Sequence, residues 1–135
     1  MSEIRYPTRL SRSPIHGKGV FSEGKIPARK KIGSMGGTLI SERAANRKAK
    51  RLRVISMVEL GNGKTLDGSI NGNHLARVNH SCKPNSYIRV IGCEVEFYAL
   101  RQISKGEEIT CSYGVSYHGG KKYCRCGVRG CLGVL

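Results

Sequence analysis

Short apolar segments separated by glycine-containing turns run through most of the chain, a pattern that predicts a mostly β domain. Residues 54–60 are expected to form a strand that runs into a hairpin turn at residues 61–64, Gly-Asn-Gly-Lys. Residues 87–91 and 94–100 are expected to form a second strand pair around Gly92. A further short strand is predicted at residues 109–112.

Alternation in the segment 94–100 indicates which side chains share a face of its strand. Cys93, Val95, Phe97 and Ala99 fall on one face. Glu94 and Glu96 fall on the other face.

The best helix candidate is the segment 41–53, with Ser41 as its N-cap. This segment is strongly basic, with Glu42 as its one acid. Its cations are Arg43, Arg47, Lys48, Lys50, Arg51 and Arg53. Such a helix is either a solvated face or a binding surface for anions, and the sequence leaves both interpretations open.

The composition restricts the class of protein. The chain has 135 residues, enough for one domain, and aromatic residues make up only 6%, so we expect a mostly aliphatic core. Its 24 Lys and Arg outnumber its 9 Asp and Glu and give a net charge of +15, which favours anionic partners such as nucleic acid. We find no apolar stretch long enough to span a membrane and no secretion signal, so we expect a soluble intracellular domain.

The cysteines favour metal binding over disulfides, because no secretion signal accompanies them. Cys124, Cys126 and Cys131 lie close together in a glycine-rich stretch, with a spacing that suits one Zn²⁺. A closed structural site needs a fourth ligand. The candidates are Cys82, His118, Cys111 and Cys93.

Three other motifs combine residue types that carry chemistry. Gly17-Lys18-Gly19 allows close approach of a ligand to the backbone, although an ordinary β-turn would also explain it. Residues 77–85, Arg-Val-Asn-His-Ser-Cys-Lys-Pro-Asn, are too polar to be all core, and Pro84 suits an Asx-type turn. Within them, His80 and Cys82 suggest an activated thiol, but we expect side chains so close in sequence not to face each other. Finally, Tyr113-Gly114 follows the last predicted strand and could present a hydroxyl group to a cleft.

Taken together, these blocks resemble those of SET-domain protein lysine methyltransferases with a C-terminal post-SET zinc segment. Residues 79–85 match the family's Asn-His-Ser-Cys-x-Pro-Asn block, and 106–114 are similar to its Gly-Glu-Glu-Leu-Thr-x-x-Tyr-Gly block. The glycine motif at 17–19 and the cysteines at 124, 126 and 131 resemble the family's cofactor loop and post-SET cysteines. The short chain resembles bacterial members.

The resemblance implies a fold of small curved β-sheets with few short helices and a C-terminal pseudoknot. In that pseudoknot, the segment around residues 79–85 and the segment that ends at Tyr113 pass through one another. The implied domains are a SET domain at residues 1–115 and a post-SET zinc segment at residues 116–135, packed on it.

The resemblance also assigns roles to individual residues. Gly17, Lys18 and Gly19 would hold the methionine part of S-adenosylmethionine, and Asn79 and His80 would bind its amino group and adenine. Arg77 would shape that pocket, and Tyr113 would be the catalytic tyrosine, in contact with both cofactor and substrate. One structural Zn²⁺ would be held by Cys82, Cys124, Cys126 and Cys131.

Two departures from the family concern the substrate side. Residues 34–38 are Ser-Met-Gly-Gly-Thr where the family commonly has Tyr-x-Gly-Glu, so Ser34 or Met35 replaces an aromatic residue. Cys111 replaces an aromatic residue that often influences the number of methyl groups transferred. A smaller side chain there would leave a roomier channel, and the product number stays open.

The charge bears on the substrate and on the competing hypotheses. A +15 enzyme repels a free basic peptide, so the target lysine of the protein substrate is expected in an acidic setting or on a nucleic-acid-associated protein such as a histone. The expected location is the bacterial cytoplasm, or a host nucleus if the protein is exported. The alternatives are a zinc-stabilised, basic nucleic-acid-binding module and a catalytically silent SET-like interaction domain.

Overall fold

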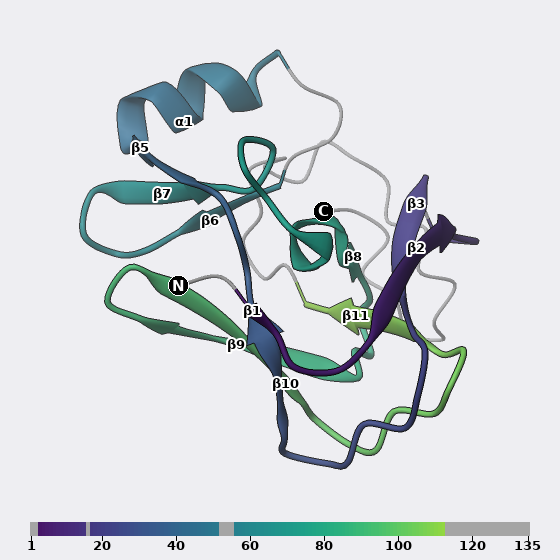
Figure 1. The fold of residues 1–135 in the computed structure, drawn as a ribbon. Helices are drawn as coiled ribbons and strands as arrows, with labels where there is room; N and C mark the ends of the chain where they lie inside the picture. Colours follow the sequence, from purple (N-terminus) through teal and green to yellow (C-terminus); the bar gives the residue numbers. More distant parts are fainter. Residues whose placement is uncertain (1–2, 16, 52–55, 113–135) are drawn as a thin grey trace.

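The computed structural model describes residues 3–15, 17–51 and 56–112. Within these ranges the chain is mostly β, as the sequence predicts, and its strands form three small sheets (Figure 1). No helix in the described part of the chain is long and apolar enough to cross a membrane.

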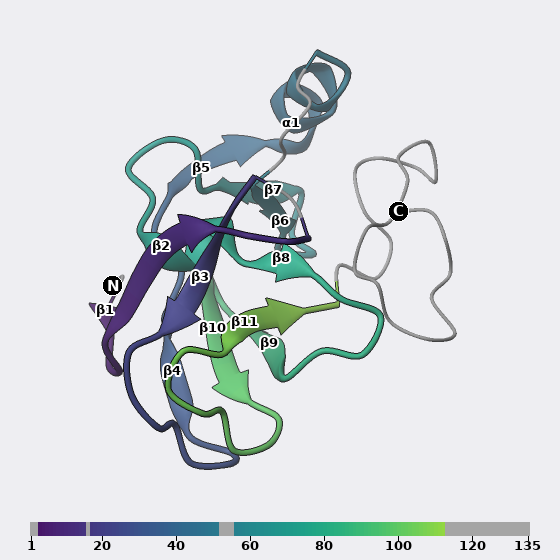
Figure 2. The same ribbon diagram turned by 90° about the vertical axis from the view of Figure 1, so that its right-hand side faces the viewer.

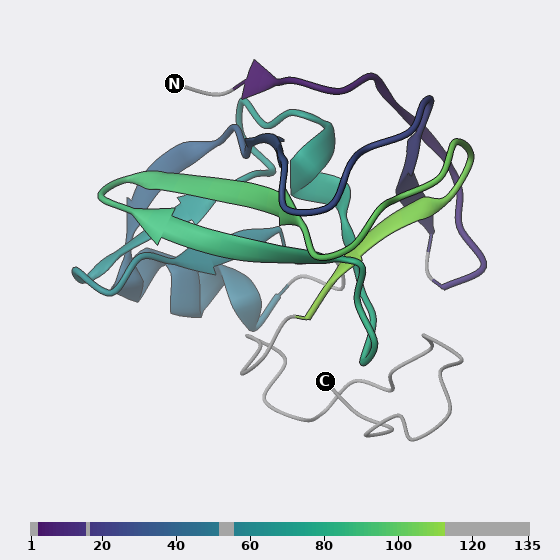
Figure 3. The same cartoon turned by 90° about the horizontal axis from the view of Figure 1, so that it is seen from below.

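The first sheet is antiparallel and contains the longest hairpin. Its strands, in spatial order, are β1 (Glu3–Ile4), β4 (Lys31–Ser34), β10 (Glu94–Ala99) and β9 (Ser86–Ile91). The hairpin of β9 and β10 turns at Gly92, whose φ of 60° suits glycine, and it lies in front in Figure 3. The predicted strand pair around Gly92 is therefore confirmed.

The second sheet joins segments that are far apart in the sequence. Its strands, in order, are β2 (Thr8–Arg12), β3 (Lys18–Ser22), β11 (Glu108–Cys111) and β8 (Asn79–His80). The pairing of β8 with β11 is parallel, whereas the other pairings are antiparallel. Figure 2 shows β8 and β11 side by side.

The third sheet carries the α-helix. It consists of β5 (Thr38–Ser41), β7 (Lys64–Asp67) and β6 (Met57–Glu59), and α1 (Glu42–Ala49) follows β5 directly. The Oγ of Ser41 accepts a hydrogen bond from the backbone N–H of Ala44 at 3.1 Å, which confirms the predicted N-cap. The helix ends at Ala49, earlier than predicted. A 3₁₀ turn, η1 (His74–Arg77), leads into β8.

The core is almost entirely aliphatic, as the composition predicts. Phe97 is the one aromatic side chain among the described residues of the buried cluster. The other members are Val20, Ile26, Ile32, Met35, Leu66, Leu75, Ala76, Val78, Val95, Ala99, Ile103, Ile109 and Cys111. All three sheets contribute side chains to this cluster, so the sheets share one core.

The predicted alternation in β10 is confirmed for Val95, Phe97 and Ala99, which are buried, but not for Cys93. Cys93 is exposed because it precedes the strand and lies beside the turn. On the opposite face Glu96 is also buried, and it forms an ion pair with Lys31 at 2.7 Å. This contact lowers the pKa of Glu96 and keeps the carboxyl ionised.

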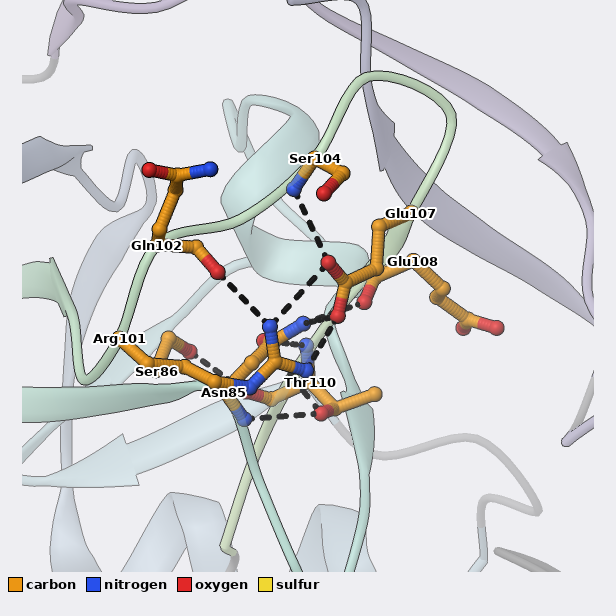
Figure 4. Close-up of polar contacts among 8 residues, drawn as sticks. All are labelled: Asn85, Ser86, Arg101, Gln102, Ser104, Glu107, Glu108 and Thr110. Carbon is orange, nitrogen blue, oxygen red and sulfur yellow. Dashed lines mark hydrogen bonds and ion pairs between the residues drawn. The ribbon is translucent and has the colours of Figure 1, made fainter. Parts of the chain in front are cut away.

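Asn85, which directly precedes β9, bonds to β11 (Figure 4) and to Leu100, which follows β10. Its side-chain Oδ1 accepts from the backbone N–H of Thr110 at 2.9 Å, and its Nδ2 donates to the backbone oxygen of Glu108 at 2.8 Å. Its backbone oxygen accepts from the N–H of Leu100 at 2.8 Å. A side-chain amide can supply both a donor and an acceptor, so this one residue fixes the segment 79–85 against β11. The threading of a pseudoknot here stays a prediction.

Glu107 extends this cluster to the surface. Its carboxylate forms an ion pair with Arg101 and accepts from the backbone N–H of Ser104 at 3.0 Å and from Asn85 Nδ2 at 3.2 Å. Because these donors favour the charged form, with Arg101 contributing most, the pKa of Glu107 falls to about 2.

Replacement of Glu107 by Gln should therefore destabilise the fold in a pH-dependent way. The pKa of Glu107 is lower in the folded state than its ordinary value of 4.5, so the ionised carboxylate stabilises the fold above pH 4.5, and this contribution is lost as the pH falls towards about 2. We expect Glu107→Gln to lower the free energy of unfolding at pH 7 by about 1 to 2 kcal/mol. The difference from the wild type should shrink between pH 4.5 and 2.

Urea unfolding at stepped pH measures this difference. Glu59→Gln is the matched control, because Glu59 is exposed, and it should change stability little at any pH. A Glu107→Gln deficit that stays constant down to pH 2 would contradict the assigned role of the ionised carboxylate.

Candidate active site

The parallel pairing of β8 with β11 brings two of the sequence motifs together. Asn79 lies opposite Thr110 and His80 lies opposite Cys111. The backbone N–H of Ser81 donates to the oxygen of Cys111 at 3.0 Å and continues the pairing. The Asn-His block therefore lies beside the strand that leads to Tyr113, which itself is outside the described residues.

The glycine loop approaches the same strand from the other side, because β3 pairs with β11. The N–H of Ser13 donates to the oxygen of Gly17 at 2.8 Å and closes the loop between β2 and β3. Gly17 has a φ of 45°, and a Cβ there would meet no described atom within 4 Å. Gly19 is buried, and a Cβ there would overlap the carboxylate of Glu108. A side chain at position 19 would therefore force the Glu108 carboxylate to move away from the loop.

Glu108 connects the glycine loop to Asn79. The Oγ of Ser13 donates to the Glu108 carboxylate and lies 2.8 Å from both of its oxygens. Asn79 Nδ2 donates to Glu108 Oε2 at 3.0 Å and lies 3.5 Å from the backbone oxygen of Lys18. Neither Glu108 nor Ser13 has a role among the sequence-based predictions. The sequence feature that could have identified Glu108 as a site residue is its place in the Gly-Glu-Glu block.

His80 is buried, and this burial lowers the pKa of its imidazole, which is therefore neutral near pH 7. Its Nε2 lies 3.3 Å from the Sγ of Cys82. Our expectation that these two side chains would not face each other was wrong, because the turn after β8 folds Cys82 back towards the ring. A neutral imidazole stabilises a thiolate less than an imidazolium does, so this contact does not favour a thiol nucleophile.

Arg77 and Lys18 are the charged members of the predicted cofactor-binding set, and both are exposed. Arg77 is the last residue of η1, two positions before Asn79. The turn η1 is connected to β2 by a contact of 2.9 Å between His74 Nδ1 and Thr8 Oγ1. Lys18 begins β3. Both cationic side chains can therefore reach solvent near the loop and β8.

The residues that depart from the family pattern are buried. Ser34 and Met35 are 1% and 6% exposed, and the Oγ of Ser34 has no hydrogen-bond partner among the described residues. Asn73 holds this segment through bonds to the backbone of Ser34 and Gly36 at 2.8 and 3.0 Å. Cys111 is 2% exposed, and burial raises the pKa of its thiol to about 12, so the thiol is neutral.

Of the four predicted zinc ligands, only Cys82 belongs to the described part of the chain, where it is half-buried beside β8. Cys124, Cys126 and Cys131 lie outside the described residues. Among the residues that are described, no three His, Cys, Asp or Glu side chains are grouped so that they could hold a metal ion.

A basic groove lies along α1, away from β8 and β11 (Figure 1). Its volume is about 620 Å³, and its lining residues are Ile40, Ala44, Arg47, Lys48, Lys50, Arg51, Asp67 and Ile70. Lys48 forms an ion pair with Asp67 and donates to Ser69 Oγ at 2.8 Å. The cations left to meet an anion in this groove are therefore Arg47, Lys50 and Arg51.

Comparison with known proteins assigns these residues to one family. Residues 17–114 match the SET domain family, a range that begins at the glycine loop and ends just after Tyr113. The chain is 31% identical over 134 residues to human histone-lysine N-methyltransferase 2B and 32% identical over 138 residues to histone-lysine N-methyltransferase set-2 of Caenorhabditis elegans. It is 30% identical over 132 residues to histone-lysine N-methyltransferase trithorax of Drosophila virilis.

These alignments include 92%, 94% and 92% of this chain but only 5%, 9% and 3% of the respective relatives. The resemblance therefore concerns one region of much longer proteins. The family match covers most of the chain and contains all the strands that build the candidate site except β2, so we conclude that this chain belongs to the SET domain family.

Proposed function

We propose that the chain is a protein-lysine N-methyltransferase that transfers a methyl group from S-adenosylmethionine to the ε-amine of a substrate lysine. The observation that carries this proposal is the convergence of the glycine loop, the Asn79–His80 block and the strand before Tyr113 in one four-stranded sheet. The names of the relatives, which are histone-lysine N-methyltransferases, support the same activity.

The residues present fit the cofactor. The space beside Gly17 is open, and Gly19 lets the backbone approach a ligand closely. Asn79 offers an amide and His80 a neutral ring at the other side of β11. We propose that Gly17, Lys18, Gly19, Arg77, Asn79, His80 and Tyr113 form the binding site. The cofactor supplies an electrophilic methyl group on a sulfonium.

The chain itself must align the reacting groups and keep the substrate amine neutral. Methyl transfer is an in-line displacement, so alignment contributes more than acid or base catalysis. Free lysine has a pKa of about 10.4, and exclusion of water lowers it because the charged amine loses solvation. We propose that the hydroxyl of Tyr113, which follows β11 by two residues, orients the amine.

A second part of the proposal concerns the C-terminal segment. We propose that residues 1–115 form the SET domain and that residues 116–135 form a post-SET segment held by one Zn²⁺. Cys82 of the first part and Cys124, Cys126 and Cys131 of the second would be the ligands, in a tetrahedral thiolate site. Cys82 lies three residues after Asn79 in the sequence, so the ion would join the C-terminal segment to the cofactor site.

The charge guides the choice of substrate. We propose a lysine in an acidic setting or in a protein associated with nucleic acid, a histone included, in the cytoplasm or in a host nucleus. The groove along α1 supports a contact with nucleic acid, because three of its cations have no ion pair with a described residue. How many methyl groups are added depends on the space left beside Cys111 and Met35.

The first test is transfer of a radiolabelled methyl group from S-adenosylmethionine to proteins of a cell lysate, with the labelled residues identified by mass spectrometry. The wild type should label lysine. Tyr113→Phe should lower kcat by at least tenfold while it changes cofactor affinity less than threefold, because the hydroxyl acts on alignment in the transition state. Wild-type kcat in this variant would remove Tyr113 from the catalytic role, and absence of labelled lysine would overturn the proposed activity.

The zinc proposal predicts one Zn²⁺ per chain. Cys126→Ser, or removal of the metal by a chelator, should abolish methylation and increase amide exchange in residues 119–135, because this glycine-rich sequence has too few apolar residues to offset its ordering entropy. The β core should remain folded.

Metal content, activity and hydrogen exchange are measured on the same sample. Cys93→Ser is the matched control, because Cys93 is exposed beside a turn and should leave metal content unchanged. Full activity without zinc, or coordination by four thiolates that survives Cys82→Ser, would contradict the proposed site.

Reversal of the three groove cations, Arg47→Glu, Lys50→Glu and Arg51→Glu together, should weaken binding to duplex DNA. The slope of log affinity against log salt should fall by about one for each phosphate that the variant no longer neutralises. The control variant Lys25→Glu, Lys30→Glu and Lys105→Glu makes the same change in net charge at other exposed turns. Equal slopes for the two variants would show that the helix is only a solvated face.

A further inference from the structure

Four carboxylates among the described residues form ion pairs with described cations, but Glu108 does not. The described groups that bond to Glu108 are neutral. Glu3, Asp67, Glu96 and Glu107 each form an ion pair with a Lys or an Arg. Glu108 accepts instead from the hydroxyl of Ser13 and the amide of Asn79. In a chain with 24 Lys and Arg and only 9 Asp and Glu, a half-buried carboxylate that no described cation pairs with requires an explanation.

The position of this carboxylate ties it to the glycine loop. It occupies the space that a side chain would need at position 19, so it lies directly against the loop backbone. Both of its oxygens are held by Ser13, whose backbone N–H also closes the loop on Gly17. The carboxylate is thereby fixed in place by described groups that leave its charge unneutralised.

Glu108 also has acceptor capacity to spare. An ionised carboxylate offers about four lone-pair positions, and Ser13 and Asn79 supply two donors. The side chain is only partly buried, so a ligand in the loop can reach it. A charge-assisted hydrogen bond to a cation is about twice as strong as a neutral one.

We propose that Glu108 is the anionic partner of the α-ammonium group of the cofactor, a role that rests on the proposed function. S-adenosylmethionine carries an ammonium, a sulfonium and one carboxylate, so its net charge is positive, and a chain of net charge +15 repels it. Glu108 offsets this repulsion at the loop. It also positions Asn79, because the bond from Nδ2 at 3.0 Å fixes the orientation of the amide.

The test compares two ligands that differ in the charged group. S-adenosylhomocysteine has the α-ammonium, whereas 5′-methylthioadenosine keeps the adenosine and the thioether but lacks the amino-acid end. Calorimetry at pH 8, where histidine is neutral, gives Kd for both. Glu108→Gln should weaken S-adenosylhomocysteine binding about tenfold and change 5′-methylthioadenosine binding less than twofold, because the amide keeps the shape but not the charge.

Ser13→Ala is the matched control, since it removes the bond from a neutral hydroxyl to the same carboxylate, together with that hydroxyl's bond from the N–H of Ile15, and keeps the carboxylate charge. It should weaken S-adenosylhomocysteine binding less than threefold. A Glu108→Gln variant that weakens binding of both ligands equally, or of neither, would show a structural role only and overturn the inference. Failure of the wild type to bind S-adenosylhomocysteine would overturn the proposed function as well.

If Glu108→Gln does not fold, carbodiimide coupling of the wild type tests whether Glu108 lies beside the ligand's amine. The reagent converts a carboxylate to an O-acylisourea, and the ligand's amine, in its neutral form, attacks the acyl carbon, forms an amide and releases the urea. With S-adenosylhomocysteine present, peptide mass spectrometry should find the ligand attached to Glu108. Attachment only at other carboxylates would contradict the proposal.

Discussion

The parallel pairing of β8 with β11 is the constraint on which the candidate site depends. It involves only two residues of each strand and is continued by the backbone bond from Ser81 to Cys111, so backbone bonds alone contribute little to it. Asn85 adds to this pairing, because its side chain bonds to backbone groups of Glu108 and Thr110. Parallel strands need a long connection between them, and here that connection contains the whole hairpin of β9 and β10. The hairpin, the Asn-His block and the strand before Tyr113 are therefore fixed together.

Charge is distributed unevenly between the site and the rest of the molecule. Lys31, Lys48 and Arg101 neutralise most of the buried or half-buried carboxylates. The remaining cations are largely at the surface, where they cost little because water and salt screen them. At the glycine loop, Glu108 contributes a negative charge whose hydrogen-bond donors, Ser13 and Asn79, are neutral, while the cations of Lys18 and Arg77 lie exposed nearby. The proposed partner of this one carboxylate is the cationic end of the cofactor.

The three residues that depart from the expected family pattern, Ser34, Met35 and Cys111, are all buried. Ser34 is the last residue of β4 and Met35 follows it; both are buried, and Met35 belongs to the core cluster. Cys111 is packed in the same core and stays protonated, so it is a small apolar side chain and not a reactive thiol.

The β class, the N-cap of the helix, the hairpin at Gly92 and the family could be predicted from the amino-acid sequence, because these depend on local turn chemistry and on motifs along the chain. The sequence also predicted that the Asn-His block and the glycine loop act together. The chain alone did not reveal that His80 faces Cys82, that Glu96 is buried with Lys31, or that Glu108 joins Ser13 to Asn79. Those contacts connect positions that hydrophobic periodicity does not relate, or depend on the course of one turn. Only the packing of the three sheets decides them, because a polar side chain takes whichever partner the fold places within hydrogen-bond distance.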